Sequence, residues 1–187
     1  VDVAGLGAAL QALTELGVSH PRARAVVEAM AHAAAVRAER LEGKALVATV
    51  DGLAALGEVG MRVMDAVSAR VVCAADTLSA AQCMSVAQSL SRSQSLSHVC
   101  ANRLLAQVVA SQPPPSSSIA DHEQFASTLA SILVSAAQAV SLSDGVRLEQ
   151  PQPQLLAVVH ATVGFMTSVD LTLVTHALAS MGCMDGE

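Results

Sequence analysis

Residues 41–57 read LEGKALVATVDGLAALG, and residues 78–94 read LSAAQCMSVAQSLSRSQ with a similar spacing of apolar and small side chains. In the first copy Leu46, Val50 and Leu53 recur at intervals of four and three, so they share one face of a helix. This copy ends in a glycine, which commonly follows the last turn of a helix. The stretch therefore predicts a helix closed by glycine, and its return predicts a repeated unit.

The repeat extends beyond these two copies. Residues 12–17 match residues 52–57, which lie 40 residues later, and residues 177–182 match both through the pattern L-x-x-[LM]-G. Residues 89–93 fit at a spacing of 37 from residues 52–56, and residues 136–140 fit about 47 further on. With partner helices between them, these copies predict four helical hairpins and the first helix of a fifth. A period of about 37–41 residues with two helices per unit is typical of an α-solenoid.

The partner helices are predicted at 21–40, 59–75 and 97–111. In the first of them the residues expected to face the core are Val26, Val27, Met30 and Val36. The longer spacing before residue 136 is assigned to the Pro- and Ser-rich loop at 113–118. The alternative is a non-repetitive helical bundle, in which Ala- and Leu-rich helices resemble one another through composition alone.

Composition independently favours an all-α protein. Hydrophobic residues make up 52% of the 187 residues and aromatic residues 1%, with no Trp or Tyr. Strands favour aromatic and β-branched side chains, whereas Ala and Leu favour helices. The small side chains also allow helices to approach one another closely.

Charge divides the chain unevenly. The net charge is −6, yet residues 1–112 are neutral, and residues 113–187 hold Arg147 against seven acids. We therefore predict three N-terminal hairpins over 1–112, a Pro/Ser-rich loop over 113–124, and an acidic helical region over 125–187.

The basic side chains of the N-terminal part are the candidate RNA contacts, because stacked repeats bring equivalent helices into one row and arginine suits phosphate. The candidates are Arg22, Arg24, Arg37, Arg40, Arg62, Arg70 and Arg103. The alternative is that they are ordinary surface charges paired with Glu28, Glu39, Asp65 and Asp76.

Motifs of catalysis and metal binding are missing from the sequence. It has no dinucleotide loop, P-loop, HExxH or GxSxG motif. We interpret 121–123 (Asp-His-Glu) as a solvated loop with capping acids, and His98-x-Cys100 as no metal site, since the two positions do not share a helix face. The sequence thus predicts neither an enzyme, a cofactor nor a metal ion.

Two further features bear on the environment of the protein. The four cysteines, Cys73, Cys83, Cys100 and Cys183, form no CxxC pair and are expected to be buried, reduced thiols. Residues 125–143 carry no charge, but they include seven Ser, Thr or Gln side chains. We interpret this segment as a buried amphipathic helix rather than a membrane span.

The segment at 78–94 resembles the first helix of octotricopeptide and heptatricopeptide repeats, which occur in organellar RNA-associated proteins, including those with a RAP domain. The resemblance implies a mitochondrial matrix protein, with the plastid or the cytoplasm as alternatives. It further implies a component of a mitochondrial ribosome or RNA-processing complex. Its partners would be the other proteins of that assembly, and rRNA or organellar RNA through the N-terminal half. An imported protein that loses its leader would fit a start at Val1.

A second hypothesis needs no RNA. An armadillo- or HEAT-like scaffold would bind a helix or an extended peptide along one face of the array. The scarcity of aromatic side chains favours a structural member of an assembly over a free-standing reader of RNA sequence.

Overall fold

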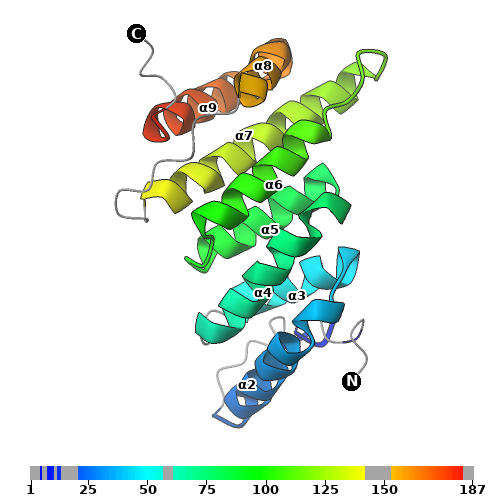
Figure 1. The fold of residues 1–187 in the computed structure, drawn as a ribbon, viewed down its shortest axis with the longest axis vertical. Helices are drawn as coiled ribbons and strands as arrows, with labels where there is room; N and C mark the ends of the chain where they lie inside the picture. Colours follow the sequence, from blue (N-terminus) through cyan, green and yellow to red (C-terminus); the bar gives the residue numbers. More distant parts are fainter. Residues whose placement is uncertain are drawn as a thin grey trace.

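The structure is a computed structural model that describes residues 5, 8–10, 12, 13, 21–56, 61–141 and 153–182. All regular secondary structure in these residues is helical, which confirms the predicted all-α class (Figure 1). Most of the helix predicted before Gly17 lies outside the described residues. The α-helices are α2 (Pro21–Val36), α3 (Gly43–Leu56), α4 (Met61–Ala74), α5 (Ala80–Arg92), α6 (His98–Ala110), α7 (Ile119–Ser141), α8 (Pro153–Thr162) and α9 (Ser168–Ser180). Short 3-10 turns form η1 (Ala38–Arg40), η2 (Ala75–Thr77) and η3 (Val163–Phe165).

The helices pack in two rows. In the odd row, α3 contacts α5, α5 contacts α7, and α7 contacts α9. In the even row, α2, α4, α6 and α8 contact one another in the same order. Helices that follow each other in the chain, such as α5 and α6, join the rows. The result is a stack along the long axis of the molecule, with α2 at one end and α8 and α9 at the other (Figure 1).

Each step from the even row to the odd row at η1, η2 and η3 uses the same short joint. The residue after the turn is extended, with φ −78° at Leu41, −88° at Leu78 and −84° at Met166. Its N–H donates to the first carbonyl of the turn, over 3.0 Å at Leu41 and at Leu78 and 3.2 Å at Met166. An extended residue cannot continue a helix, so the joint redirects the chain into the next helix. Leu41 and Leu78, 37 residues apart, are both buried.

Burial follows the same period. In α3 the buried residues are Leu46, Thr49, Val50, Gly52 and Leu53, and in α5 they are Cys83, Val86, Ala87, Ser89 and Leu90. Each residue of the second set lies 37 after its counterpart in the first. The spacing read from the sequence is therefore also the spacing of the packed positions.

The step from α5 to α7 is longer. The Ser91 hydroxyl donates to Gln138 Oε1 over 2.6 Å, which joins residues 47 apart, the spacing expected from the sequence. The extra length lies only partly in the Pro/Ser loop, because α7 begins at Ile119, inside the segment 113–124 that was expected to be a loop. The first turns of α7 instead reach η3, where the ring of His122 stacks on that of Phe165 with centroids 4.7 Å apart.

α7 contains the amphipathic core helix that the uncharged segment predicted, because its buried residues lie between Phe125 and Ala139. None of the helices in the described part of the chain has the length and apolar character that crossing a membrane requires.

Two predicted core residues are wrong. Val26 is 48% exposed and Val36 is 69% exposed. Val27 is buried as predicted, and Met30 is partly buried against the core; the other buried positions of α2 are Ala31 and Ala34. Among the described helices α2 packs mainly against α4, with smaller contacts to α3 and η1, and its buried positions form one stripe.

Candidate functional site

Two of the predicted RNA-contact arginines bond to other parts of the chain. Arg70 on α4 donates from Nε to the Leu41 carbonyl over 2.8 Å, and from a terminal nitrogen to Glu42 Oε1 over 3.2 Å. Arg103 on α6 donates to Asp76 Oδ2 over 2.6 Å. Both arginines therefore tie an even-row helix to the preceding joint. Asp76 is one of the acids named in the alternative of paired surface charges, whereas Glu42 is not.

The joints also explain why Arg70 is where it is. Gln107, which lies 37 residues after Arg70, donates from Nε2 to the Leu78 carbonyl over 3.0 Å. The same carbonyl position is thus bound by a side chain from the next even-row helix in two successive units. Arg70 acts as a structural clamp at this position, and its positive charge is shared with Glu42.

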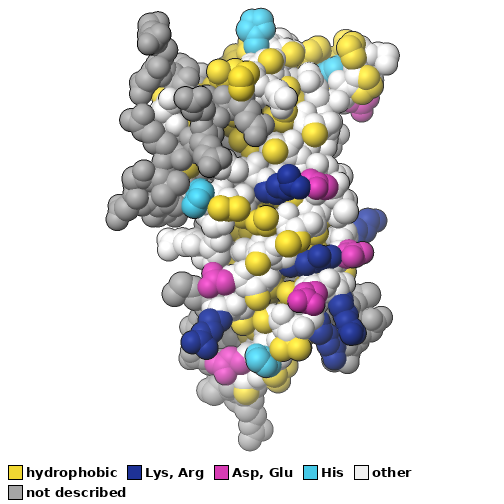
Figure 2. All heavy atoms as spheres, viewed as in Figure 1, with side chains coloured by type: hydrophobic (Ala, Val, Ile, Leu, Met, Phe, Trp, Pro, Cys, Tyr) yellow, Lys and Arg dark blue, Asp and Glu magenta, His cyan; other side chains and the backbone are white. Residues whose placement is uncertain are grey.

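The other arginine candidates differ in their surroundings. Arg40 and Arg62 are exposed, and neither has a carboxylate partner among the described residues. Arg37 is half-buried and engaged in an interaction within the chain. The side chains of Arg22 and Arg24 lie outside the described part. Figure 2 shows basic side chains next to acidic ones on the viewed face, where a continuous basic stripe is not visible.

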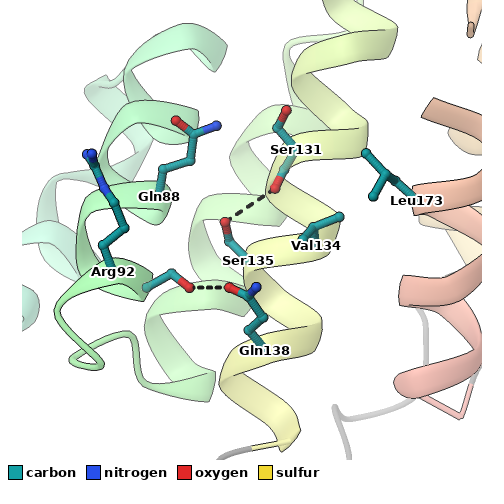
Figure 3. Close-up of a pocket in the computed structure, with 8 residues that line it drawn as sticks. Gln88, Arg92, Ser131, Val134, Ser135, Gln138 and Leu173 are labelled. Atoms are coloured by element: carbon teal, nitrogen blue, oxygen red, sulfur yellow. Dashed lines mark hydrogen bonds between the residues drawn. The ribbon is translucent and has the colours of Figure 1, made fainter. Parts of the chain in front are cut away.

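A groove of about 550 Å³ crosses α5, α7 and α9 of the odd row. It is lined by Gln88, Ser91, Arg92, Ser131, Val134, Ser135, Gln138 and Leu173. Figure 3 shows Ser131, Ser135 and Gln138 of α7 on the side toward α5, and Val134 pointing toward Leu173 of α9, while Arg92 extends along α5. Most of the lining residues are polar, and Arg92 is the one charged residue among them.

A chain of hydrogen bonds holds one end of the groove. Ser89, which is fully buried, donates to Asp51 Oδ1 over 2.6 Å and accepts from a terminal nitrogen of Arg92 over 2.9 Å. Ser85 donates to the second oxygen of Asp51 over 3.0 Å. The carboxylate on α3 thus orients two hydroxyls of α5, and one of these fixes an edge of the guanidinium. The rest of the exposed Arg92 side chain is left for contacts from outside.

On the opposite wall the amides and hydroxyls of α7 are held less completely. Gln138 accepts from Ser91 through Oε1, so its amide N–H groups remain available as donors. Ser135 donates to the Ser131 carbonyl over 3.3 Å, within the helix (Figure 3). The groove therefore presents donors from both walls, above the apolar surface of Val134 and Leu173.

The cysteines are unsuited to thiolate chemistry where they are buried. Burial raises the pKa of Cys83 to about 11. Burial, together with repulsion from the Cys83 thiolate, raises the pKa of Cys100 to about 12. Both thiols are therefore protonated near neutral pH. Cys73 is exposed, which corrects the expectation that it is buried, and Cys183 lies outside the described residues.

The acidic sequence at 121–123 begins a helix. Asp121 accepts hydrogen bonds from the Ser118 hydroxyl and the Ser118 N–H, which lower the pKa of its carboxyl. The expected capping role is present, in the first turn of α7. Within the described ranges no group of three His, Cys, Asp or Glu side chains is placed to hold a metal ion.

Sequence reasoning missed the groove. Arg92 was not among the candidate contacts, because they were chosen from the helices of the even row. One signal was available, since Asp51 and Gln88 occupy the same position of two copies 37 residues apart and both are polar. That periodic polar position marks the outward face of the odd row.

Comparison with protein-family models, with curated protein sequences and with solved structures finds no match to this chain. Function is therefore inferred from the geometry of the fold and its groove.

Proposed function

We propose that the protein is a non-catalytic α-solenoid scaffold in a larger assembly and that it binds another protein along the groove of α5, α7 and α9. The groove carries this proposal: it crosses three successive helices of one row and combines several hydrogen-bond donors with an apolar surface. Extended concave surfaces built from stacked repeats are a common way to bind peptides and helices.

The solenoid part of the proposal is supported by three observations. Each helix contacts the helix two places further along the chain. The joints at Leu41 and Leu78 have the same hydrogen bond and lie 37 residues apart. The buried positions of α3 recur in α5 with the same spacing.

A protein partner is favoured over RNA by the pairing of the charges. Arg70 and Arg103 are bound to Glu42 and Asp76, so their positive charge is partly neutralised inside the chain. A protein that grips RNA gains most of its non-specific affinity from unpaired basic side chains against phosphate.

The second candidate is the role implied by the organellar repeat resemblance, in a mitochondrial ribosome or an RNA-processing complex. Arg40 and Arg62 favour it, because both are exposed and lack a carboxylate partner among the described residues. In that case the even row would touch RNA while the groove of the odd row holds a protein.

Site-specific photo-crosslinking tests the proposal. A photoreactive amino acid would replace Gln88, which is exposed in the groove, and in a matched control it would replace Ala69, which is exposed on α4. Each full-length variant would be irradiated in an extract of the cells that produce the protein, with and without ribonuclease. We expect a discrete protein adduct from position 88 that survives ribonuclease, and none of that size from position 69.

Two outcomes contradict the proposal. One is an adduct that forms equally from both positions, because the groove would then have no special role. The other is an adduct at position 88 that is lost after ribonuclease treatment, which would identify RNA as the ligand of the groove.

A further inference from the structure

We propose that the groove recognises an acidic side chain of the partner protein, with Arg92 as the residue that binds its carboxylate. This inference rests on the proposed function and names the chemistry of the partner at the same site. It predicts a short partner segment in which a Glu or Asp is accompanied by apolar residues.

The first step is that Arg92 is charged, and among the described residues no carboxylate lies within ion-pair distance of it; the Asp51 carboxylate is linked to it only through the Ser89 hydroxyl. Arg70 and Arg103 each lie within ion-pair distance of an acid, at 3.2 Å and 2.6 Å. The contact recorded for Arg92 is with the neutral hydroxyl of Ser89, at 2.9 Å. Among the described residues, then, this guanidinium is oriented without being neutralised by a direct ion pair.

The second step is that the orientation leaves donors for a ligand. The Ser89 hydroxyl accepts a hydrogen bond from one terminal N–H of Arg92 and donates one to Asp51. An arginine offers five N–H donors in a planar fork that matches a carboxylate. With one of them used by Ser89, the others can form a two-point contact with an incoming carboxylate.

The third step concerns the rest of the groove. Gln88 lies four residues before Arg92 on α5, on the same face of the helix. Gln138 offers its amide N–H groups from α7, since its Oε1 accepts from Ser91. Val134 and Leu173 supply apolar surface for the methylenes beside the carboxylate. A volume of about 550 Å³ accommodates a few side chains rather than a whole domain.

A nucleic-acid ligand fits this lining less well. One arginine is the only charge among the lining residues. Binding of single strands generally combines several cations with aromatic platforms for the bases, and the lining contains no aromatic side chain. A single carboxylate needs only one fork and a few amide donors.

A pair of probe peptides tests the inference on the full chain. The first is an acetylated, amidated peptide that alternates Ala, Leu and Glu, and the second has every Glu replaced by Gln. Binding would be followed by nuclear magnetic resonance of the isotope-labelled protein, through the side-chain amides of Gln88 and Gln138. We expect saturable shifts of these signals with the Glu peptide, binding that weakens as salt is added, and at least about tenfold weaker binding of the Gln peptide.

Two variants assign the effect to Arg92. Arg92→Gln should weaken the Glu peptide about tenfold and leave the Gln peptide unchanged. Gln88→Glu should have a similar effect without removing the guanidinium, because a glutamate four residues before an arginine pairs with it on the helix surface. Arg62→Gln is the matched control, since Arg62 is an exposed arginine on α4, and it should bind like the unaltered protein. Both groove positions are exposed, so the folded state should persist, as circular dichroism can verify.

Several results would overturn the inference. They are equal binding of the two peptides, unchanged binding by Arg92→Gln, failure of the Glu peptide to bind, and a uridine oligonucleotide that shifts the groove signals while the peptide does not. If neither peptide binds but a protein still crosslinks at position 88, the acidic partner is wrong and the scaffold function stands. If the crosslink is also missing, both are wrong.

Discussion

Arg70 and Arg92 lie in the two rows of the same stack, and they show how environment divides the roles of one residue type. Arg70 spans from α4 to the joint before α3, where a backbone carbonyl and a carboxylate take its hydrogens. Arg92 lies on α5 at the groove, where a single hydroxyl holds one edge. The first arginine stabilises the fold, and the second remains available to a partner. Charge alone does not identify a binding arginine, because the hydrogen bonds that it makes within the chain determine which of its N–H donors remain for a partner.

The largest effect on the free energy of unfolding should come from an apolar side chain in a joint, compared with one in the groove. Leu41 is fully buried in the joint, and Leu173 is 39% exposed in the groove. Leu41→Ala should lower the free energy of unfolding by about 2–5 kcal/mol, because it removes buried methyl groups and leaves a cavity. Leu173→Ala should change it by about 0.5 kcal/mol or less. Urea denaturation measures both, and equal losses would contradict the division between joint and groove.

Removing the arginines should give the next largest difference. Arg70→Ala leaves the Leu41 carbonyl without its side-chain donor and should cost about 1–3 kcal/mol in unfolding free energy. Arg92→Ala should cost about 0.5 kcal/mol or less, because its side chain is exposed. Denaturation of the two variants in the same buffer makes the comparison. A greater loss at Arg92 would show that its bond to Ser89 supports the fold.

A smaller effect is expected for the exposed ion pair of the even row. Arg103 and Asp76 meet at 2.6 Å, but their side chains are 48% and 64% exposed. A double-mutant cycle with Arg103→Gln and Asp76→Asn should give a coupling of about 0.2–1 kcal/mol. The coupling should shrink at high salt, because mobile ions screen exposed charges. A coupling that does not change with salt would indicate a more protected pair than the structure describes.

The smallest effect on stability should come from the first turns of two helices, α5, which follows the joint at Leu78, and α7, which follows the Pro/Ser-rich loop. Ser79 exchanges hydrogen bonds with Gln82 at the start of α5, and Ser118 does so with Asp121 at the start of α7. The pKa of Asp121 is lowered by Ser118, so this contribution to stability is present above the ordinary carboxyl pKa and is lost as pH falls through the lowered value. The Ser79 and Gln82 side chains that cap α5 are not ionisable, so their contribution to stability should not change with pH.

Nuclear magnetic resonance of the carboxyl group can measure this difference. Ser118→Ala should return the Asp121 pKa toward its ordinary value, whereas Ser79→Ala should leave it unchanged. An unaltered pKa in Ser118→Ala would mean that another group lowers it.

The sequence predicted the helical class and the repeat spacing because packing imposes them locally. Leu53 and Leu90 recur 37 residues apart, and both are buried because each lies at the same depth in its row. Ser91 and Gln138, which are 47 residues apart, bond across α5 and α7. Periodic apolar positions report burial whenever consecutive units pack alike.

The roles of the arginines could not be predicted in the same way. Whether Arg70 meets Glu42 depends on how α4 crosses the preceding joint, and the residues are 28 apart in sequence. The groove at Arg92 depends on the placement of α7 and α9, which no local pattern specifies. Val36 fails for a similar reason: its helix contacts few neighbours in the described structure, so an apolar position remains exposed.

The stack is not strictly periodic. Buried positions of α3 and α5 are 37 residues apart, whereas Ser91 and Gln138, which bond across α5 and α7, are 47 apart. In a perfectly periodic array, a bound peptide could slip by one unit and meet an equivalent set of contacts. The longer α7 removes that equivalence, because the side chains facing α5 across the groove differ from those that α5 presents to α3. If the proposed partner binds in the groove, we expect it to have a single favoured register along the stack.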